Sequence, residues 1–280
     1  MALTKSNCNT ATDNVVFDVQ GCVAIVTGAN RPNGIGHAIV EALLAAGASK
    51  VYATGRKVEQ LNTLVSAHPS GKVVPVQLDM KDLSAIKGLH EKCPDVNLIV
   101  NNAGYLVTNN GPLDSIEGAA EEMAVNYLGP LALVHTFQAN LKKQGVQSSM
   151  KKTSAVVNVM SICSFVNFKV AATYSCTKAA GHSLTIAQRR DLSPYNCHVM
   201  GVYPGPIDTD IGEWNKGNPM PPPSCVADAI VAALLSGEDD VFPDKAAQDL
   251  HHEFLKGPKE QEKKLLESDV GRENKKQRNN

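Results

Sequence analysis

The sequence predicts an α/β fold in which a doubly wound parallel sheet of about seven strands carries helices on both faces. Short apolar, β-branched runs alternate along the chain with longer segments of helical periodicity, which is typical of strand–helix–strand units. The first of these runs leads into a glycine-rich turn and then a helical pattern. With 280 residues, 43% of them hydrophobic, the chain is long enough to bury a large core as a single domain.

The alternation sets the expected order of elements. The expected strands are Cys22–Thr27, Lys50–Thr54, Val73–Gln77, Leu98–Asn101, Ser154–Met160, Cys197–Tyr203 and Asp240–Phe242. The expected helices are His37–Ala46, Val58–Ala67, Leu83–Lys92, Ile116–Tyr127 continuing past Pro130 to Gln144, Tyr174–Leu192 and Ser224–Ser236. We expect the strand order 3-2-1-4-5-6-7, which places a ligand at the point where the order reverses.

The turn after the first strand has the pattern of a dinucleotide-binding loop. Gly28 permits a tight turn, Gly34 lets the backbone approach a pyrophosphate, and Gly36 lets the helix pack closely on the strand. The N-terminus of the following helix offers N–H groups and a positive dipole end to phosphates. An ordinary βα loop is the alternative, but the flanking strand and helix favour a Rossmann-type dinucleotide site.

Two arginines bear on which dinucleotide is bound. Sites that select NAD usually place an acid at the end of the second strand, where it binds the ribose 2′-hydroxyl. This chain has Gly55 and Arg56 there, and Arg31 lies in the glycine-rich loop. Because guanidinium groups suit phosphate oxygens, we expect NADP(H) as the cofactor. The alternative is that Arg56 is a solvated residue that caps the next helix.

Tyr174 and Lys178 form the strongest catalytic signal. Residues four apart share one face of a helix, so the phenol and the ammonium can point into one cleft. A phenol has a reference pKa of about 10, and a neighbouring cation lowers the pKa toward the range useful for proton transfer. Ser161 ends a predicted strand and can hydrogen-bond the reacting oxygen. Alone, such a pair is more often an aromatic ring packed beneath a lysine stem.

Taken together, these motifs resemble the short-chain dehydrogenase/reductase family, in its branch of about 250-residue subunits, from roughly Gly21 to Phe242. The loop Thr27–Gly36 is similar to the family's T-G-x-x-x-G-x-G, with two more residues around Pro32. The resemblance assigns Asn126, Ser161, Tyr174 and Lys178 to a catalytic tetrad. It implies cofactor contacts from Gly28, Asn30, Arg31, Gly34, Ile35, Gly36, Arg56, Asp79, Met80, Asn102, Ala103, Gly104, Tyr174, Lys178, Pro204, Gly205, Ile207 and Thr209.

The expected activity is reversible hydride transfer between nicotinamide and a carbonyl/alcohol pair. Tyr174 donates the proton, and Ser161 holds the carbonyl oxygen. The resemblance implies that Lys178 also binds the nicotinamide ribose and that Asn126 holds a water linking Lys178 to solvent. Substrate contacts are expected from Ser161, Cys163, Phe165, Phe168 and Trp214.

An apolar or aromatic substrate fits these side chains, although ordinary core packing explains the aromatic residues about as well. Residues 207–223 are expected to form a substrate lid, with the prolines Pro221–Pro223 either part of it or a stiff connector before the next helix.

Composition limits the other possibilities. A net charge of −1 and a pI of about 6.7 give no electrostatic reason to expect nucleic acid or an anionic membrane as a partner. No apolar stretch resembles a signal peptide or a membrane span. The seven cysteines form no C-x-x-C pair, which fits reduced thiols in a cytoplasmic protein, and no histidine spacing indicates a metal site.

Residues 1–20 are expected to be an N-terminal extension, 21–245 the catalytic domain, and 246–280 a charged helix and tail. The resemblance implies a homodimer or homotetramer. Three alternatives to the expected reductase stay open: an NAD-preferring alcohol dehydrogenase, a non-catalytic dinucleotide-binding sensor, and a dehydratase or epimerase on the same fold.

Overall fold

The structure is a computed structural model that describes residues 16–108, 111, 114–143, 151–210, 217 and 219–267. Trp214 and most of the expected lid centre, residues 211–216 and 218, lie outside the described residues. The end of the predicted C-terminal tail, from residue 268 onward, lies outside them as well.

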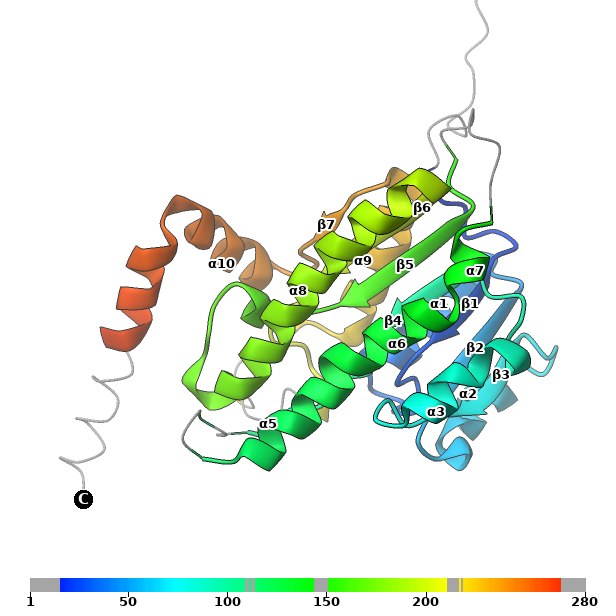
Figure 1. Cartoon of the computed structure of the whole chain (residues 1–280), viewed down its shortest axis with the longest axis horizontal. Coiled ribbons are helices and arrows are strands. Elements are labelled where there is room, and N and C mark those ends of the chain that lie inside the picture. The colour runs from blue at the N-terminus through cyan, green and yellow to red at the C-terminus, as the bar shows by residue number, and fades with distance from the viewer. Residues whose placement is uncertain are drawn as a thin grey trace, which may run out of the picture.

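Seven parallel strands form one sheet in the order β3-β2-β1-β4-β5-β6-β7, which confirms the predicted topology (Figure 1). The strands are β1 (Val23–Val26), β2 (Lys50–Gly55), β3 (Val73–Gln77), β4 (Leu98–Asn101), β5 (Ser154–Val159), β6 (Cys197–Val202) and β7 (Asp240–Val241). β4, β5 and β6 are buried along their whole length, which explains their near-continuous apolar sequences.

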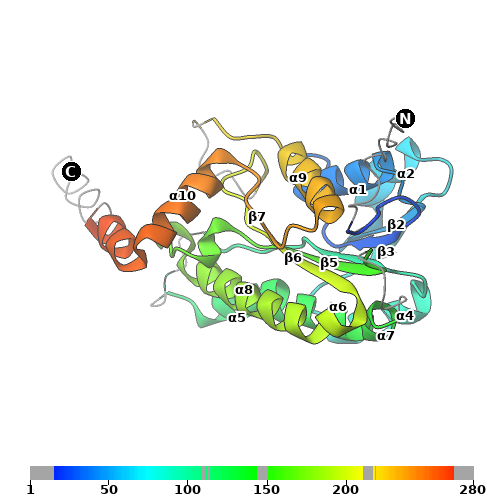
Figure 2. The same ribbon diagram turned by 90° about the horizontal axis from the view of Figure 1, so that it is seen from above.

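Helices cover both faces of the sheet. Figure 2 shows α1 (Ile35–Ala45), α2 (Asn62–Ala67) and α9 (Pro223–Ser236) on one side of the sheet. The opposite side carries α4 (Leu89–Lys92), α5 (Ile116–Met123), α6 (Gly129–Thr136), α7 (Gln138–Leu141) and α8 (Ala172–Leu192), and α3 (Leu83–Lys87) packs against α6. Each layer encloses its own apolar cluster, so the sheet is buried from both sides.

The predicted long helix from Ile116 to Gln144 is divided in the structure. Between α5 and α6 the backbone widens into a π-helical turn, η2 (Ala124–Leu128). Pro130 explains the widening, because its ring would clash with the carbonyl of the residue four positions earlier, Asn126, in a regular α-helix. The π turn therefore forms at the position of a predicted catalytic residue.

Short 3₁₀ turns account for most remaining differences from the predicted helices. Residues expected to begin one helix form η1 (Val58–Leu61) before α2, and α3 is separated from α4 at Gly88. The other turns are η3 (Ile162–Ser164), η4 (Lys169–Ala171) and η5 (Ser193–Tyr195). Pro222 is the N-cap of α9 and Pro223 its first residue, so these two prolines begin a helix.

The C-terminal helix α10 (Lys245–Lys256) projects beyond the β7 edge of the sheet in both ribbon views (Figures 1 and 2). A second helical stretch spans residues 258–267. α10 is amphipathic and buries Ala247 near its start. Within the described ranges, no helix has the length and apolarity needed to cross a membrane.

Candidate active site

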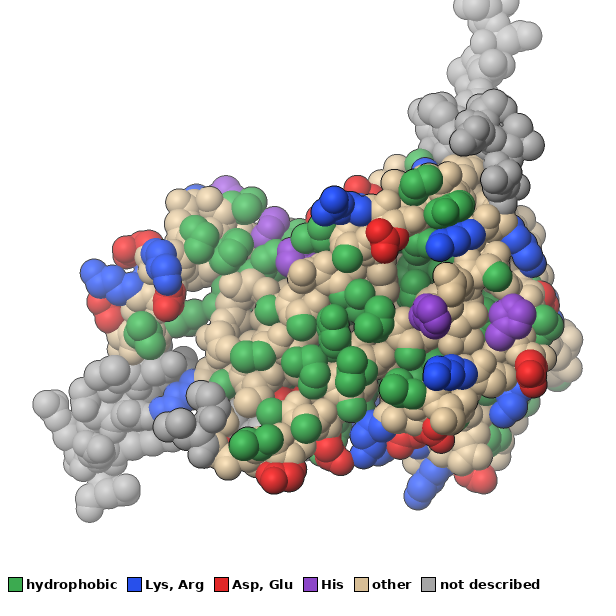
Figure 3. All heavy atoms as spheres, in the orientation of Figure 1, with side chains coloured by type: hydrophobic (Ala, Val, Ile, Leu, Met, Phe, Trp, Pro, Cys, Tyr) green, Lys and Arg blue, Asp and Glu red, His purple; other side chains and the backbone are tan. Residues whose placement is uncertain are grey.

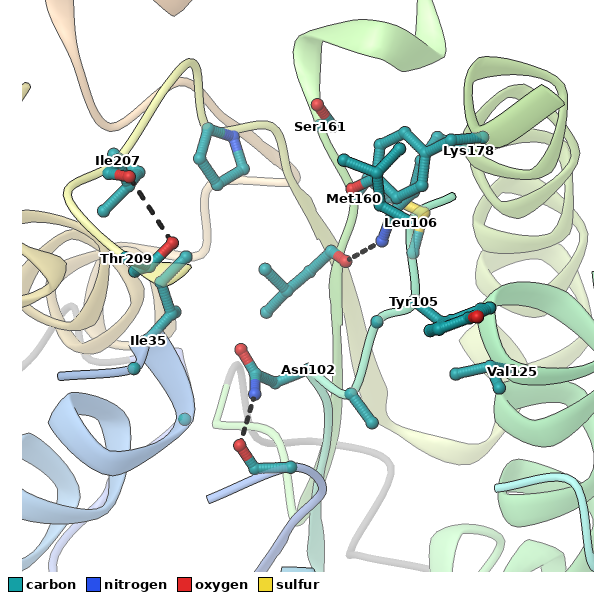
Figure 4. Close-up of a pocket in the computed structure, with 18 of the residues that line it drawn as sticks. Ile35, Asn102, Tyr105, Leu106, Val125, Met160, Ser161, Lys178, Ile207 and Thr209 are labelled. Carbon is teal, nitrogen blue, oxygen red and sulfur yellow. Dashed lines mark hydrogen bonds between the residues drawn. The ribbon is translucent and has the colours of Figure 1, made fainter. Parts of the chain in front are cut away.

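A cavity of about 710 Å³ opens at the carboxyl ends of β1, β2, β4, β5 and β6. Every residue predicted to contact the cofactor lines it, although those residues span positions 28 to 209 of the chain. In Figure 4, Ile35 and Thr209 approach the cavity from one side and Ser161 and Lys178 from the other, with Asn102 between them. The predicted dinucleotide and catalytic residues therefore share one continuous space.

Glycines shape the end of the cavity beside α1. Gly28 has φ +68°, and a Cβ there would lie 2.9 Å from Ala103 Cα. A Cβ on Gly36 would lie 2.5 Å from both the Gly28 carbonyl oxygen and Asn102 Nδ2. Only glycine fits these two positions, and α1 then directs its N-terminus at the cavity. This cradle fits the phosphates of a dinucleotide.

Gly34 also has a local packing function. It is the N-cap of α1, and a Cβ there would lie 3.0 Å from the Arg31 carbonyl oxygen. The glycine therefore makes room for the expanded loop itself.

Thr27 ties the glycine-rich loop to the segment after β4. Its hydroxyl accepts hydrogen bonds from the backbone N–H groups of Asn102 and Ala103, each at 2.9 Å, and donates to the Val100 carbonyl. The Asn102 side chain donates back to the Thr27 carbonyl at 2.8 Å. These bonds fix the two loops at the point where the strand order reverses, which was predicted to be the ligand site.

The two predicted phosphate-binding arginines lie in different surroundings. Arg56 is exposed at the end of β2, and η1 begins after Lys57 with no side-chain cap, so Arg56 does not cap that helix. Arg31 forms an ion pair with Asp210 at 3.4 Å. Asn30 packs against Gly55 and donates to Gln60 at 2.7 Å. Of the two arginines, Arg56 is the one without an ion pair among the described residues, and it lies where a 2′-phosphate is expected.

The remaining cofactor residues come from the ends of β3 and β6. Asp79 lines the cavity and accepts the Lys81 N–H at 2.9 Å, and buried Met80 packs against Gly129. On the other side, the Gly205 N–H donates to the Asp244 carboxylate at 2.7 Å. Asp244 is also the N-cap of α10, so the helix and the Pro204–Thr209 segment are held together.

Tyr174 and Lys178 lie on one face of α8, as predicted. The Lys178 ammonium lies 5.4 Å from the centroid of the Tyr174 ring and donates to the Val159 carbonyl at 3.0 Å. Ser161 follows β5, where it caps η3 by accepting the Cys163 N–H at 3.1 Å. The three side chains line the same end of the cavity.

The net shift of the Tyr174 pKa is opposite to the predicted one. Burial raises the pKa of Tyr174, and the charges of Cys163 and Glu122 add to this, while a hydrogen bond with Ser161 opposes it. Burial also lowers the pKa of Lys178 to about 8. Loss of water around the buried pair outweighs the attraction between ammonium and phenolate. The neutral phenol, a proton donor, is therefore the stable form near pH 7.

Asn126 lies behind the cavity. Its side-chain amide donates to the Tyr105 carbonyl at 2.8 Å and to the Thr177 hydroxyl at 2.9 Å. Its oxygen accepts the Tyr105 N–H at 2.9 Å. Both amide hydrogens are thus engaged by protein groups, and Asn126 joins α8 to the segment after β4. The expected water-binding role of Asn126 stays a prediction.

The predicted substrate residues are only partly brought together. Ser161, Cys163 and Phe168 line the cavity. Phe165 does not; its ring packs 5.0 Å from His251 and 4.9 Å from Tyr203, in a cluster that joins η3 to α10. Phe165 is therefore a packing residue, because η3 turns it away from the cavity. Burial raises the pKa of Cys163, which fits a lining thiol rather than a reactive one.

Several lining residues were missed by sequence reasoning. They are apolar and come from the segment after β5 and from α10: Val170, Ala171, Ala246 and Leu250. The four-residue spacing of Ala246 and Leu250 places both on one helix face, but the sequence gave no sign that this face meets the cavity.

A family model described as short chain dehydrogenase matches residues 22–218. An uncharacterized oxidoreductase of Staphylococcus saprophyticus is 29% identical over 229 residues, covering 78% of this chain and 93% of the relative. An uncharacterized oxidoreductase of Staphylococcus epidermidis is 31% identical over 221 residues, covering 76% of this chain and 90% of the relative.

Solved structures agree with these sequence matches. A short chain dehydrogenase from Burkholderia cenocepacia, in complex with NADP, is 35% identical with a TM-score of 0.79, covering 89% of this chain and 99% of that one. A short-chain dehydrogenase from Streptomyces avermitilis is 24% identical with a TM-score of 0.76 and shares the fold. The match covers 90% of this chain and 99% of that one.

Proposed function

The chain belongs to the short-chain dehydrogenase/reductase family of oxidoreductases, and from this premise we propose that it is an NADP(H)-dependent reductase of apolar carbonyl compounds. One observation carries the proposal. Ser161, Tyr174 and Lys178 gather at one end of a cavity whose other end is a glycine cradle beside Arg56. A site that only bound dinucleotide would not need a buried phenol beside an ammonium.

The chemistry divides between the cofactor and the protein. When bound, NADPH supplies the hydride. Tyr174, neutral near pH 7, donates its proton to the carbonyl oxygen, and the Ser161 hydroxyl stabilises the negative charge that develops on that oxygen. The Lys178 ammonium stabilises the phenolate left behind.

The preference for NADPH rests on the end of β2. Arg56 lines the cavity there and is exposed, and the strand ends without an acid. A guanidinium attracts a 2′-phosphate, whereas the ribose 2′-hydroxyl of NADH gives it no charged partner. The Burkholderia cenocepacia relative, solved with NADP, supports the same choice.

An apolar substrate is favoured by the walls near Ser161. The lining side chains there, Leu106, Ile162, Phe168, Val170 and Leu250, are all apolar. Arginine lines the cavity in the described residues only at Arg31 and Arg56, on the side given to the cofactor. Among the described lining residues, a phosphorylated or coenzyme A-linked substrate would find no cation beside Ser161 other than the catalytic Lys178.

Self-association is part of the proposal. Leu128, Leu131 and Ile186 are 41%, 38% and 42% exposed and lie on η2, α6 and α8. Figure 3 shows hydrophobic side chains gathered over these helices on one face of the molecule. We expect this face to join two copies into a homodimer, which can pair again into a tetramer.

The test is NADPH oxidation by purified protein with a panel of aldehydes, ketones and quinones, alongside Tyr174→Phe. We expect activity on apolar carbonyls, and a variant that binds NADPH but has lost turnover. Near-normal turnover by Tyr174→Phe would refute the role given to the phenol.

A further inference from the structure

Asp244 is a buried acid between the Pro204–Thr209 segment and the wall that α10 contributes to the cavity. It is the N-cap of α10 and only 7% exposed. Burying a carboxylate is costly unless its oxygens are paired, and here both are paired. Oδ1 accepts the Ala247 N–H of its own helix at 2.9 Å, and Oδ2 accepts the Gly205 N–H at 2.7 Å. Capping the helix requires only the first of these bonds.

The second bond joins two parts of the cavity wall. Gly205 lines the cavity on the side given to the cofactor, and Ala246 and Leu250 line it from α10. The two parts lie close together, because a Cβ on Gly205 would lie 2.7 Å from Asp244 Oδ1 and 3.3 Å from Ala246 Cβ. Ala246 and Leu250 are four residues apart and share one face of the helix. The bond to Gly205 therefore sets how far this face lies from the segment that contacts the cofactor.

The segment and the helix differ in how else they are held. The segment has a backbone bond to η3, in which the Ile162 N–H donates to the Pro204 carbonyl at 3.0 Å. α10 instead projects beyond the β7 edge of the sheet (Figure 1). It packs against η3 through side chains, with the His251 ring 5.0 Å from that of Phe165. Loss of the Asp244 bond should therefore move the start of the helix more than the segment.

We propose that Asp244 is a positioning residue, which holds the Ala246 and Leu250 face of α10 in place and so determines how well an apolar substrate fits. Asp244 does not line the cavity, so it acts on the substrate only through that face. The inference rests on the proposed function for the class of substrate. The position of α10, however, can be followed without any substrate.

Two variants separate positioning from capping. Serine and asparagine cap helices about as well as aspartate, so Asp244→Ser and Asp244→Asn should keep α10 folded. Both lack the second acceptor oxygen that holds Gly205. In cofactor-free protein, the amides of residues 245–251 should exchange with deuterium several-fold faster in both variants than in wild type, with thermal unfolding measured to confirm folding. Asp249→Asn is the control, because this acid lies on the same helix, is exposed and lies outside the cavity.

Kinetics with NADPH tests the effect on the substrate. The probe ketone is benzophenone, replaced by acetophenone if the wild type reduces only the smaller one. We expect KM for the ketone to rise roughly 3- to 10-fold in Asp244→Ser, the effect of one lost hydrogen bond, with KM for NADPH within about twofold of wild type. Because Asp244 acts through the α10 face, adding Asp244→Ser to Leu250→Ala should raise KM little beyond the larger single effect.

Three results would overturn the inference: effects that multiply in the double variant, a larger change of KM for NADPH than for the ketone, or α10 exchange no faster than in Asp249→Asn. A wild-type protein that reduces neither ketone would instead count against the proposed function, and deuterium exchange would still decide whether Asp244 positions α10.

Discussion

The two ends of the cavity are built in different ways. The cofactor end consists of backbone and glycine: a Cβ at Gly28 or Gly36 would come within 2.9 Å of neighbouring atoms. The substrate end consists of side chains from four separate segments, among them Leu106, Ile162, Phe168 and Leu250. The first end tolerates almost no change of residue, because backbone cannot move aside, whereas the second can change its shape by exchanging one apolar side chain for another. A rigid cofactor site and an adaptable substrate site can thus share one cavity.

Lys178 lies beside Tyr174 at the end of the cavity opposite the glycine cradle, and its replacement should have the largest effect. Lys178→Met is expected to reduce carbonyl reduction by about 10²- to 10⁴-fold, because the phenolate loses its cation. In wild type, the pKa of Lys178 is lowered to about 8 by burial. The ammonium is charged below that value and neutral above it, so reduction should fall as the pH rises through about 8.

The measurement is kcat for carbonyl reduction at saturating NADPH from pH 6 to 10. The Lys178→Met variant should reduce carbonyls slowly, and its kcat should not fall near pH 8. A variant that keeps the wild-type pH profile would show that a group other than Lys178 governs the pH dependence.

Gly36→Ala tests the rigidity of the cofactor end. The added Cβ would lie 2.5 Å from the Gly28 carbonyl oxygen, and overpacking of this kind costs about 1–3 kcal/mol. We expect dinucleotide binding, measured by fluorescence titration, to weaken by roughly 10- to 100-fold, with a lower thermal unfolding temperature. Gly88→Ala is the control, because its Cβ would meet no atom closer than 3.6 Å. Equal losses in both variants would mean that close packing at Gly36 is not the cause.

The same contrast explains what the sequence could predict. The cofactor end follows from local signals: a buried strand, a glycine turn and a helix start determine where Gly28 and Gly36 lie. The substrate end depends on tertiary packing. Phe165 was expected in the pocket, but η3 turns its ring toward His251. Leu250 carries no motif and reaches the cavity only because Asp244 ties the start of α10 to Gly205.

The pKa values of the catalytic pair show most clearly what could not be predicted from sequence. Sequence spacing identified Tyr174 and Lys178 as a pair, and the structure brings them together. It could not reveal their burial, which reverses the expected direction of the Tyr174 pKa shift.

Arg56→Ala probes cofactor choice with a smaller expected effect. Losing a charged contact to the 2′-phosphate should raise KM for NADPH by roughly 10- to 100-fold and leave KM for NADH nearly unchanged. Lys57→Ala removes the adjacent exposed cation, which does not line the cavity, and should change neither value. Initial rates with both cofactors provide the measurement. Equal changes for NADPH and NADH would overturn the assignment of Arg56.

Leu250→Ala should have the smallest effect and bears directly on the substrate end. Leu250 is half-buried against the cavity, so its truncation removes only part of an apolar wall. We expect KM for a bulky apolar ketone to rise roughly 3- to 10-fold, while KM for NADPH stays constant. Leu255→Ala on the same helix is the control, since that side chain is 67% exposed and lies outside the cavity. If Leu250→Ala changed KM for NADPH instead, α10 would serve the cofactor end, and the division of the cavity into a rigid and an adaptable end would fail.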